Sequence, residues 1–84
     1  MPYIKQTLRQ ELQHYLDCPK PQDVGELNYV ITQICRDFLS RSKASYADHN
    51  AVIGVLESAK LEFYRRAVSP YEDRKIAENG DVYP

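Results

Sequence analysis

Apolar side chains recur every three or four residues along most of the chain, which is the spacing of one face of an α-helix. In the first segment the recurring positions are Ile4, Leu8, Leu12, Tyr15 and Leu16. No stretch alternates apolar and polar residues for long enough to indicate a β-strand. The pattern therefore predicts an all-α protein. Its first helix is expected over about residues 3–17, ending before Pro19 and Pro21.

Two longer amphipathic segments follow, and each begins with a capping signal. Asp23 is followed three residues later by Glu26, and Ser45 by Asp48. These signals predict helices over about residues 23–42 and 46–68. The expected core stripes are Val24, Leu27, Ile31, Ile34 and Phe38 on the second helix, and Val52, Leu56, Ala59, Phe63 and Ala67 on the third. Because the link between them is short and polar, we expect an antiparallel helical hairpin with the first helix packed across it.

The sequence after residue 68 predicts a new helix start. Ser69 is the expected N-cap and Pro70 the expected first helical residue. The side chain of Glu72 can reach back toward the cap. We expect a short fourth helix over about residues 70–78, which Asn79 and Gly80 end.

The third helix carries more apolar residues than one face can hold, since Val55 and Leu61 lie off its main stripe. Gly54 in its interior costs up to about 1 kcal/mol relative to alanine. Its presence predicts the close approach of another helix, and Ala51 and Ser58 extend a stripe of small residues beside it. Surplus apolar surface in so small a chain favours self-association, so we expect a homo-oligomer.

Composition and charge narrow the range of functions. The 84 residues make a single domain over 1–84, with 43% hydrophobic and 27% charged residues. Eleven basic against 12 acidic residues give a net charge of −1, which argues against a nucleic-acid partner, and Arg36, Arg41 and Lys43 form only a weak basic patch. No apolar run is long enough to span a bilayer, and the N-terminus lacks a secretory signal, so we expect a cytoplasmic protein with no membrane partner.

Catalytic and metal-binding patterns are not evident in the sequence. The two cysteines and the two histidines lack the spacing of a metal site. Glu57 and Glu62 are five residues apart, which is not the spacing with which paired helices hold magnesium. We therefore expect a protein that is not an enzyme, with no catalytic residue, metal ligand or cofactor.

Tyr64, Arg65, Arg66 and Tyr71 are the candidate ligand-binding residues. A guanidinium group offers a planar fork of donors to phosphate, and a tyrosine ring can stack on a base. The break expected before the fourth helix would fold these groups together, and the new helix start would add free backbone N–H groups for an anion. The alternative is that both arginines lie at a helix C-terminus, where cations are favoured in any case, and that the tyrosines serve packing.

Several segments distributed over the chain carry a family resemblance. They are Met1-Pro2-Tyr3-Ile4, Gly25-Glu26-Leu27-Asn28-Tyr29, Glu62-Phe63-Tyr64-Arg65-Arg66, Pro70-Tyr71-Glu72-Asp73 and Glu78-Asn79-Gly80-Asp81-Val82-Tyr83. Together they resemble a family of small, functionally uncharacterised helical proteins of bacteriophages and prophage-carrying bacteria. The resemblance implies a phage setting, and hence the host cytoplasm, and it carries no activity.

Two hypotheses follow from this setting, because small phage proteins are often non-enzymatic accessory factors. In the first, the chain is an oligomeric binder of a phosphate-bearing small molecule, which would sequester a host defence signalling nucleotide. In the alternative, it is an adaptor or inhibitor that binds a host protein through an apolar helix face.

Overall fold

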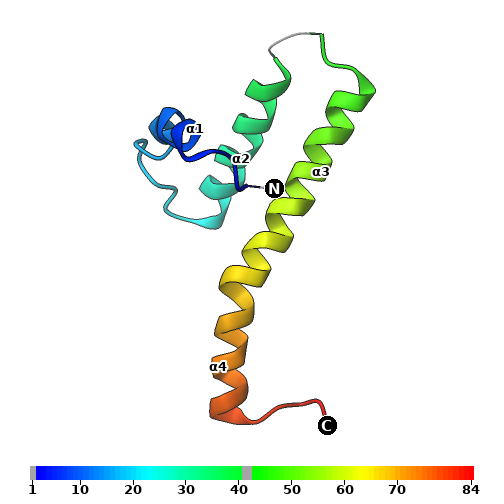
Figure 1. The fold of residues 1–84 in the computed structure, drawn as a ribbon. Coiled ribbons are helices and arrows are strands. Elements are labelled where there is room, and N and C mark those ends of the chain that lie inside the picture. The colour runs from blue at the N-terminus through cyan, green and yellow to red at the C-terminus, as the bar shows by residue number, and fades with distance from the viewer. Residues whose placement is uncertain (1, 41–42) are drawn as a thin grey trace.

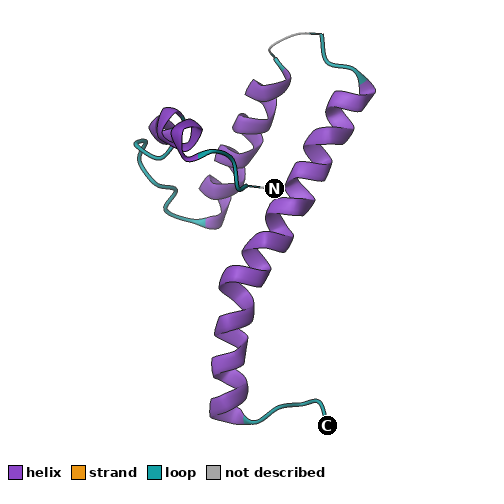
Figure 2. Ribbon diagram, viewed as in Figure 1, coloured by secondary structure: helices purple, strands orange, loops and turns teal. Residues whose placement is uncertain are grey.

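The computed structural model describes residues 2–40 and 43–84, and over these residues it contains helices and no strand (Figure 2), which confirms the all-α prediction. In chain order the elements are α1 (Gln6–Glu11), the 3₁₀ turn η1 (Gln13–Tyr15), α2 (Val24–Leu39), α3 (Tyr46–Phe63), the π-helical turn η2 (Tyr64–Val68) and α4 (Ser69–Asn79). The helices α2 and α3 form the predicted antiparallel hairpin, and α3, η2 and α4 continue as one long helix (Figure 1).

The capping signals set the starts of α2 and α3 as predicted. Asp23 Oδ1 accepts a hydrogen bond of 2.8 Å from the N–H of Glu26, and the Glu26 side chain accepts one of 2.9 Å from the N–H of Gln22. Ser45 and Asp48 form a reciprocal capping box, in which each side chain accepts a hydrogen bond from the other residue's N–H. These bonds satisfy backbone donors that have no partner within the helix. Residue 42, the expected end of the second helix, and Arg41 of the basic patch lie outside the described residues, and α2 ends at Leu39.

The first helix is shorter than predicted, and its packing across the hairpin is not observed. After α1 the backbone tightens into η1, where the N–H of Tyr15 bonds to the carbonyl of Leu12, three residues back. No close approach between α1 and α2 is found among the described residues, and Figure 1 shows α1 standing to the side of α2 that is away from α3. A short helix that packs on nothing is marginal in water. Because α1 does not pack on α2, no tertiary contact stabilises an extension of the helix to residue 17.

The predicted break at Ser69-Pro70 is wrong, because the helix passes through it. In η2 the N–H of Ser69 bonds to the carbonyl of Tyr64, five residues back rather than four. A proline ring inside a regular α-helix clashes with the carbonyl four residues earlier, and the wider π-helical turn relieves that clash. The Ser69 side chain makes no capping bond, and α4 runs on to Asn79. There Gly80, with a positive φ of +91°, ends the helix, as the sequence predicted.

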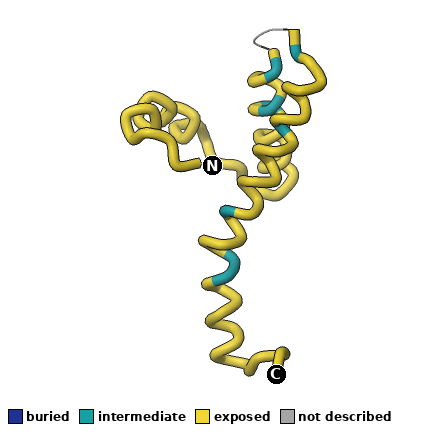
Figure 3. The backbone as a smooth tube through the Cα atoms, turned by 45° about the vertical axis from the view of Figure 1, so that its right-hand side comes forward, coloured by how far each residue is buried: buried dark blue, intermediate teal, exposed yellow. Residues whose placement is uncertain are grey.

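No described residue is buried, so a single copy of the chain has no hydrophobic core. The half-buried residues gather near the hairpin loop and around the end of α3 (Figure 3); they are Gln33, Cys35, Leu39, Ala44, Val52, Glu62, Val68 and Ser69. The radius of gyration is 16.9 Å, against about 12 Å for a compact chain of this length. The stripes expected to form the core therefore lie largely open to solvent, with Phe63, for example, 66% exposed.

Within the described segments, every helix is too short or too polar to span a bilayer.

Candidate functional site

The four candidate ligand-binding residues lie along one continuous helix, at the π-helical turn and just beyond it. The break that was expected to fold them together is absent. Consecutive residues of a helix such as Arg65 and Arg66 do not face each other, and among the described residues no hydrogen bond, ion pair or ring contact joins any two of the four. The free N–H groups expected at a helix start are also missing, since the N–H of Ser69 is donated to Tyr64. The structure does not assemble the predicted anion site within one chain.

Tyr64 is engaged by a carboxylate. Its hydroxyl donates a hydrogen bond of 2.5 Å to Glu72, which lies one turn into α4. This bond, together with the negative charge of Glu72, raises the pKa of Tyr64, because a phenolate would lie directly beside a carboxylate. A tyrosine tip held in this way, next to an acidic group, does not favour a bound phosphate.

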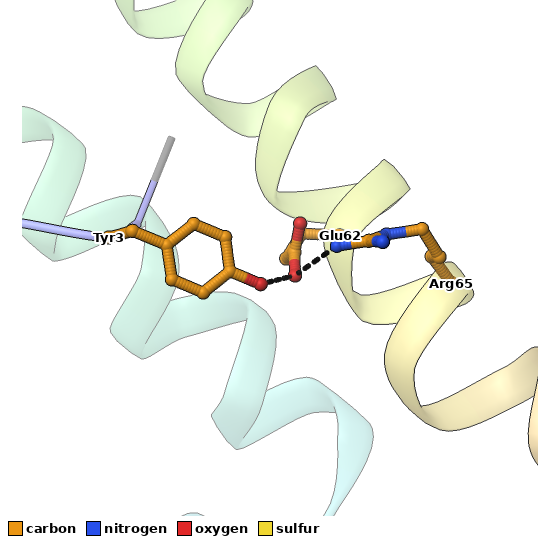
Figure 4. Close-up of polar contacts among 3 residues, drawn as sticks. All are labelled: Tyr3, Glu62 and Arg65. Carbon is orange, nitrogen blue, oxygen red and sulfur yellow. Dashed lines mark hydrogen bonds and ion pairs between the residues drawn. The ribbon is translucent and has the colours of Figure 1, made fainter.

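Arg65 is paired with Glu62, which also receives the hydroxyl of Tyr3 (Figure 4). Arg65 Nη2 lies 3.3 Å from Glu62 Oε1. The Glu62 side chain is 20% exposed, whereas that of Arg65 is 66% exposed. The hydrogen bond from Tyr3 first, and then the charge of Arg65 and its hydrogen bond, lower the pKa of Glu62. The cluster of Tyr3, Glu62 and Arg65 therefore ties the N-terminal segment to α3 and keeps the carboxylate charged.

Tyr71 presents its ring to cations of its own helix. The guanidinium carbon of Arg74 and the ammonium nitrogen of Lys75 each lie 5.7 Å from the centre of the ring. Such cation–π contacts use the ring surface that a stacked base would need. Arg66 is different, because among the described residues it forms no ion pair or hydrogen bond.

A groove of 780 Å³ lies elsewhere, between α2 and the segment that leads into it. The apolar part of its lining includes Tyr15, Leu16, Leu27, Val30, Ile31 and Ile34. Lys20 and Asp37 add one cation and one anion. The groove exists because α1 and η1 do not pack on α2, which leaves the apolar stripe of α2 uncovered.

In the part of the chain that the structure describes, no three histidine, cysteine, aspartate or glutamate side chains lie close enough together to hold a metal ion. Cys18 is exposed at the edge of the groove, and Cys35 is half-buried within α2.

The comparison with protein families gives one result. A family model described as "Domain of unknown function (DUF6899)" matches residues 1–82. The chain belongs to this family. No curated protein and no solved structure matches the chain. The match spans every described helix of this chain, from α1 to the end of α4.

Sequence reasoning missed two features of this DUF6899 chain. It assigned the apolar stripe of α2 to a core, and the structure shows instead that Leu27, Ile31 and Ile34 of this stripe line an open groove. It also gave no role to Tyr3 or Glu62. The three-residue spacing of Glu62 and Arg65 was an available signal for their ion pair, but the contact with Tyr3, across 59 positions, has no sequence signal.

Proposed function

We propose that this chain is a non-catalytic binding protein whose groove along α2 receives an apolar helix of another protein. This is the adaptor or inhibitor alternative among the two functions expected from the sequence. It places the docking surface on the second helix, α2. The observation that carries it is the 780 Å³ groove lined by the exposed stripe of α2.

The length of the stripe favours a helix over a small molecule as the occupant. Apolar residues continue beyond the groove from Val24 to Phe38, a distance of about 21 Å at the rise of an α-helix. A helix that presents apolar residues at positions i, i+3, i+4 and i+7 matches such a stripe along its whole length. Lys20 and Asp37 would add charge pairing that fixes the direction of the bound helix.

Site-specific photo-crosslinking in the cells that naturally make the protein tests this proposal. A benzophenone amino acid replaces Tyr15, which lines the groove, or Tyr46, which is exposed at the start of α3 and serves as the control. We expect Tyr15, and not Tyr46, to cross-link to one protein, at an amphipathic helical segment. Cross-links from Tyr15 only to other copies of this chain would contradict the proposal.

A synthetic peptide of the cross-linked segment then provides the quantitative test. Ile31→Asp places a charge in the groove, and Thr32→Asp places the same charge on the neighbouring residue, which does not line it. We expect the first variant to weaken binding at least tenfold, which corresponds to about 1.4 kcal/mol, and the second to leave the affinity near that of the wild type. Equal affinities for both variants would show that the groove is not the site.

A phosphate-bearing small molecule remains the second candidate, and one observation favours it. Arg66 extends from a π-helical turn, a feature frequent at functional sites, and among the described residues it forms no ion pair. Native mass spectrometry of gently purified protein tests this candidate. A bound mass carrying phosphate that is lost in the Arg65→Ala, Arg66→Ala double variant, with helix content unchanged, would support it. Protein free of such a mass would count against it.

The phage setting stays an expectation from the resemblance, and the proposed function does not depend on it.

A further inference from the structure

One copy of the chain exposes far more surface than a folded monomer of its mass. Its accessible surface is 7950 Å², whereas a compact monomer of 9.8 kDa exposes about 5,200 Å². The excess is roughly 2,800 Å² per chain. Since no described residue is buried, this excess includes the side chains that would otherwise form a core.

The uncovered apolar surface of α3 extends to more than one side of the helix. Val52, which is half-buried, lies in the N-terminal half of α3, the helix that packs on α2. Around the helix, Val55 lies about 60° and Leu61 about 180° from Val52, and they are 65% and 59% exposed. A helix that is apolar all round belongs in an interior. The structure therefore leaves α3 with a second face, carrying Val55 and Leu61, which the described part of the same chain covers only in part, where Tyr3 reaches Glu62, about 20° around the helix from Val55.

The position of Gly54 on this second face is unexplained within one chain. A Cβ atom added to Gly54 would meet no atom within 4 Å, so the close helix approach expected from the sequence does not occur inside the protomer. At 100° per residue, Ala51, Gly54 and Ser58 fall within about 60° of one another, and Val55 and Leu61 border them on either side. Large residues beside small ones make the face complementary to a copy of itself.

We propose that a second copy of this chain packs on the α3 face that carries Val55 and Leu61, and that the chain folds only as this homodimer. The excess surface of two chains is about 5,600 Å². It includes the α2 groove as well as the α3 face, and it leaves room for the roughly 2,000 Å² at which obligate homodimer interfaces begin. A net charge of −1 per chain gives little repulsion between copies.

The choice of a copy over a foreign partner follows from the missing core. A chain with no buried residue among those described needs a partner to cover its apolar surface before its helices can hold a groove in a fixed shape. Other copies of the same chain are available as that partner wherever the protein is made. The proposal is independent of the groove on α2, which lies on a different helix.

Sedimentation and denaturant unfolding over a hundredfold range of concentration test the proposal. We expect a species of twice the chain mass, and an unfolding midpoint that rises with concentration because dissociation and unfolding are coupled. A monomer with undiminished helix content at every concentration would overturn it.

Two substitutions test whether the interface lies on this face of α3. Leu61→Asp should abolish the dimer and reduce helicity, whereas Lys60→Asp introduces the same residue at the adjacent, exposed position and should leave the dimer intact. A dimer that survives Leu61→Asp would overturn the placement on this face.

Gly54→Ala provides a variant that does not depend on loss of folding. In an isolated helix with open space around residue 54, alanine would raise the unfolding midpoint. Against a closely packed second copy, the added methyl should instead weaken association at least tenfold. Association as tight as that of the wild type would contradict the proposal.

The two proposals fail separately. Ile31→Asp on α2 should leave the dimer intact, so a dimer lost in this variant as well as in Leu61→Asp would assign the groove to self-association. That result would remove the proposed function while leaving homodimer formation in place.

Discussion

Glu62 receives hydrogen bonds from two residues that lie far apart in the sequence, Tyr3 and Arg65. Its pKa is lowered, so the contribution of this contact to stability is fully present above the ordinary pKa of a glutamate, about 4.3, and is lost as the pH falls through the lowered value. Acid should therefore release the N-terminal segment from α3 only below the ordinary range of a carboxyl group.

Tyr3→Phe tests the dominant cause of this shift. The variant lacks the hydroxyl that donates to Glu62, so the pKa of Glu62 should rise toward its ordinary value, as a carboxyl-carbon NMR titration would measure. Tyr46→Phe is the control, because Tyr46 is exposed and its hydroxyl makes no hydrogen bond among the described residues. A Glu62 pKa that stays equally low in Tyr3→Phe would show that Arg65 alone sets it.

Tyr64 gives the opposite pH dependence. Its pKa is raised by the hydrogen bond to Glu72, so the contact is fully present below the ordinary tyrosine pKa of about 10 and is lost as the pH rises through the raised value. In an alkaline NMR titration of the ring carbons, we expect the ionisation of Tyr64 to be delayed beyond the ordinary tyrosine pKa. Glu72→Gln should remove most of this delay, and Asp73→Asn should not. A delay that persists in Glu72→Gln would refute the assignment.

At the scale of elements, the capping box at the start of α3 makes a measurable contribution to stability. Ser45→Ala removes the acceptor for the N–H of Asp48 and should lower the free energy of unfolding by about 1 kcal/mol. Urea denaturation at one fixed protein concentration measures this loss. Ser45→Asp keeps an acceptor and should recover most of it; if both variants lose equally, the cap is not the cause.

The elements that the sequence predicted correctly are those set by local chemistry. The starts of α2 and α3 and the end of α4 depend on hydrogen bonds or backbone angles within a few residues of Asp23, Ser45 and Gly80. The break at Pro70 was predicted wrongly because a proline at a helix start and a proline behind a π-helical turn have the same local sequence. Only the backbone path upstream distinguishes them.

The parts that could not be predicted depend on contacts between distant segments. The length of α1 follows from its lack of packing on α2, which no local pattern contains. The same holds for the candidate site, where the sequence located Tyr64, Arg65, Arg66 and Tyr71 but could not show which carboxylates and cations engage them.

At the scale of the whole molecule, the lack of a core predicts that protection against hydrogen exchange depends on concentration. We expect the amides of α2 and α3 to lose protection together when the protein is diluted, because α3 depends on the covered interface and α2 packs only on α3 among the described helices. The amides of α1 should exchange rapidly at every concentration, since this short helix is not packed.

Exchange mass spectrometry at two concentrations decides this point. The residues 24–39 and 46–63 report on the hairpin, and the residues 6–11 provide the internal reference. Protection of α2 and α3 that is unchanged by dilution would mean that a single chain is stable without a partner.

The π-helical turn has a consequence for how this long helix can change. Its hydrogen bonds close over five residues instead of four, so it accommodates one residue more than a regular turn. Loss of a single residue between positions 64 and 68 would thus leave an unbroken, regular helix in which α3 and α4 keep nearly the same rotational phase. The same deletion within a regular turn of α3 would instead rotate the following faces by about 100°. This stretch is therefore the place in the long helix where a change of length alters the alignment of its faces least.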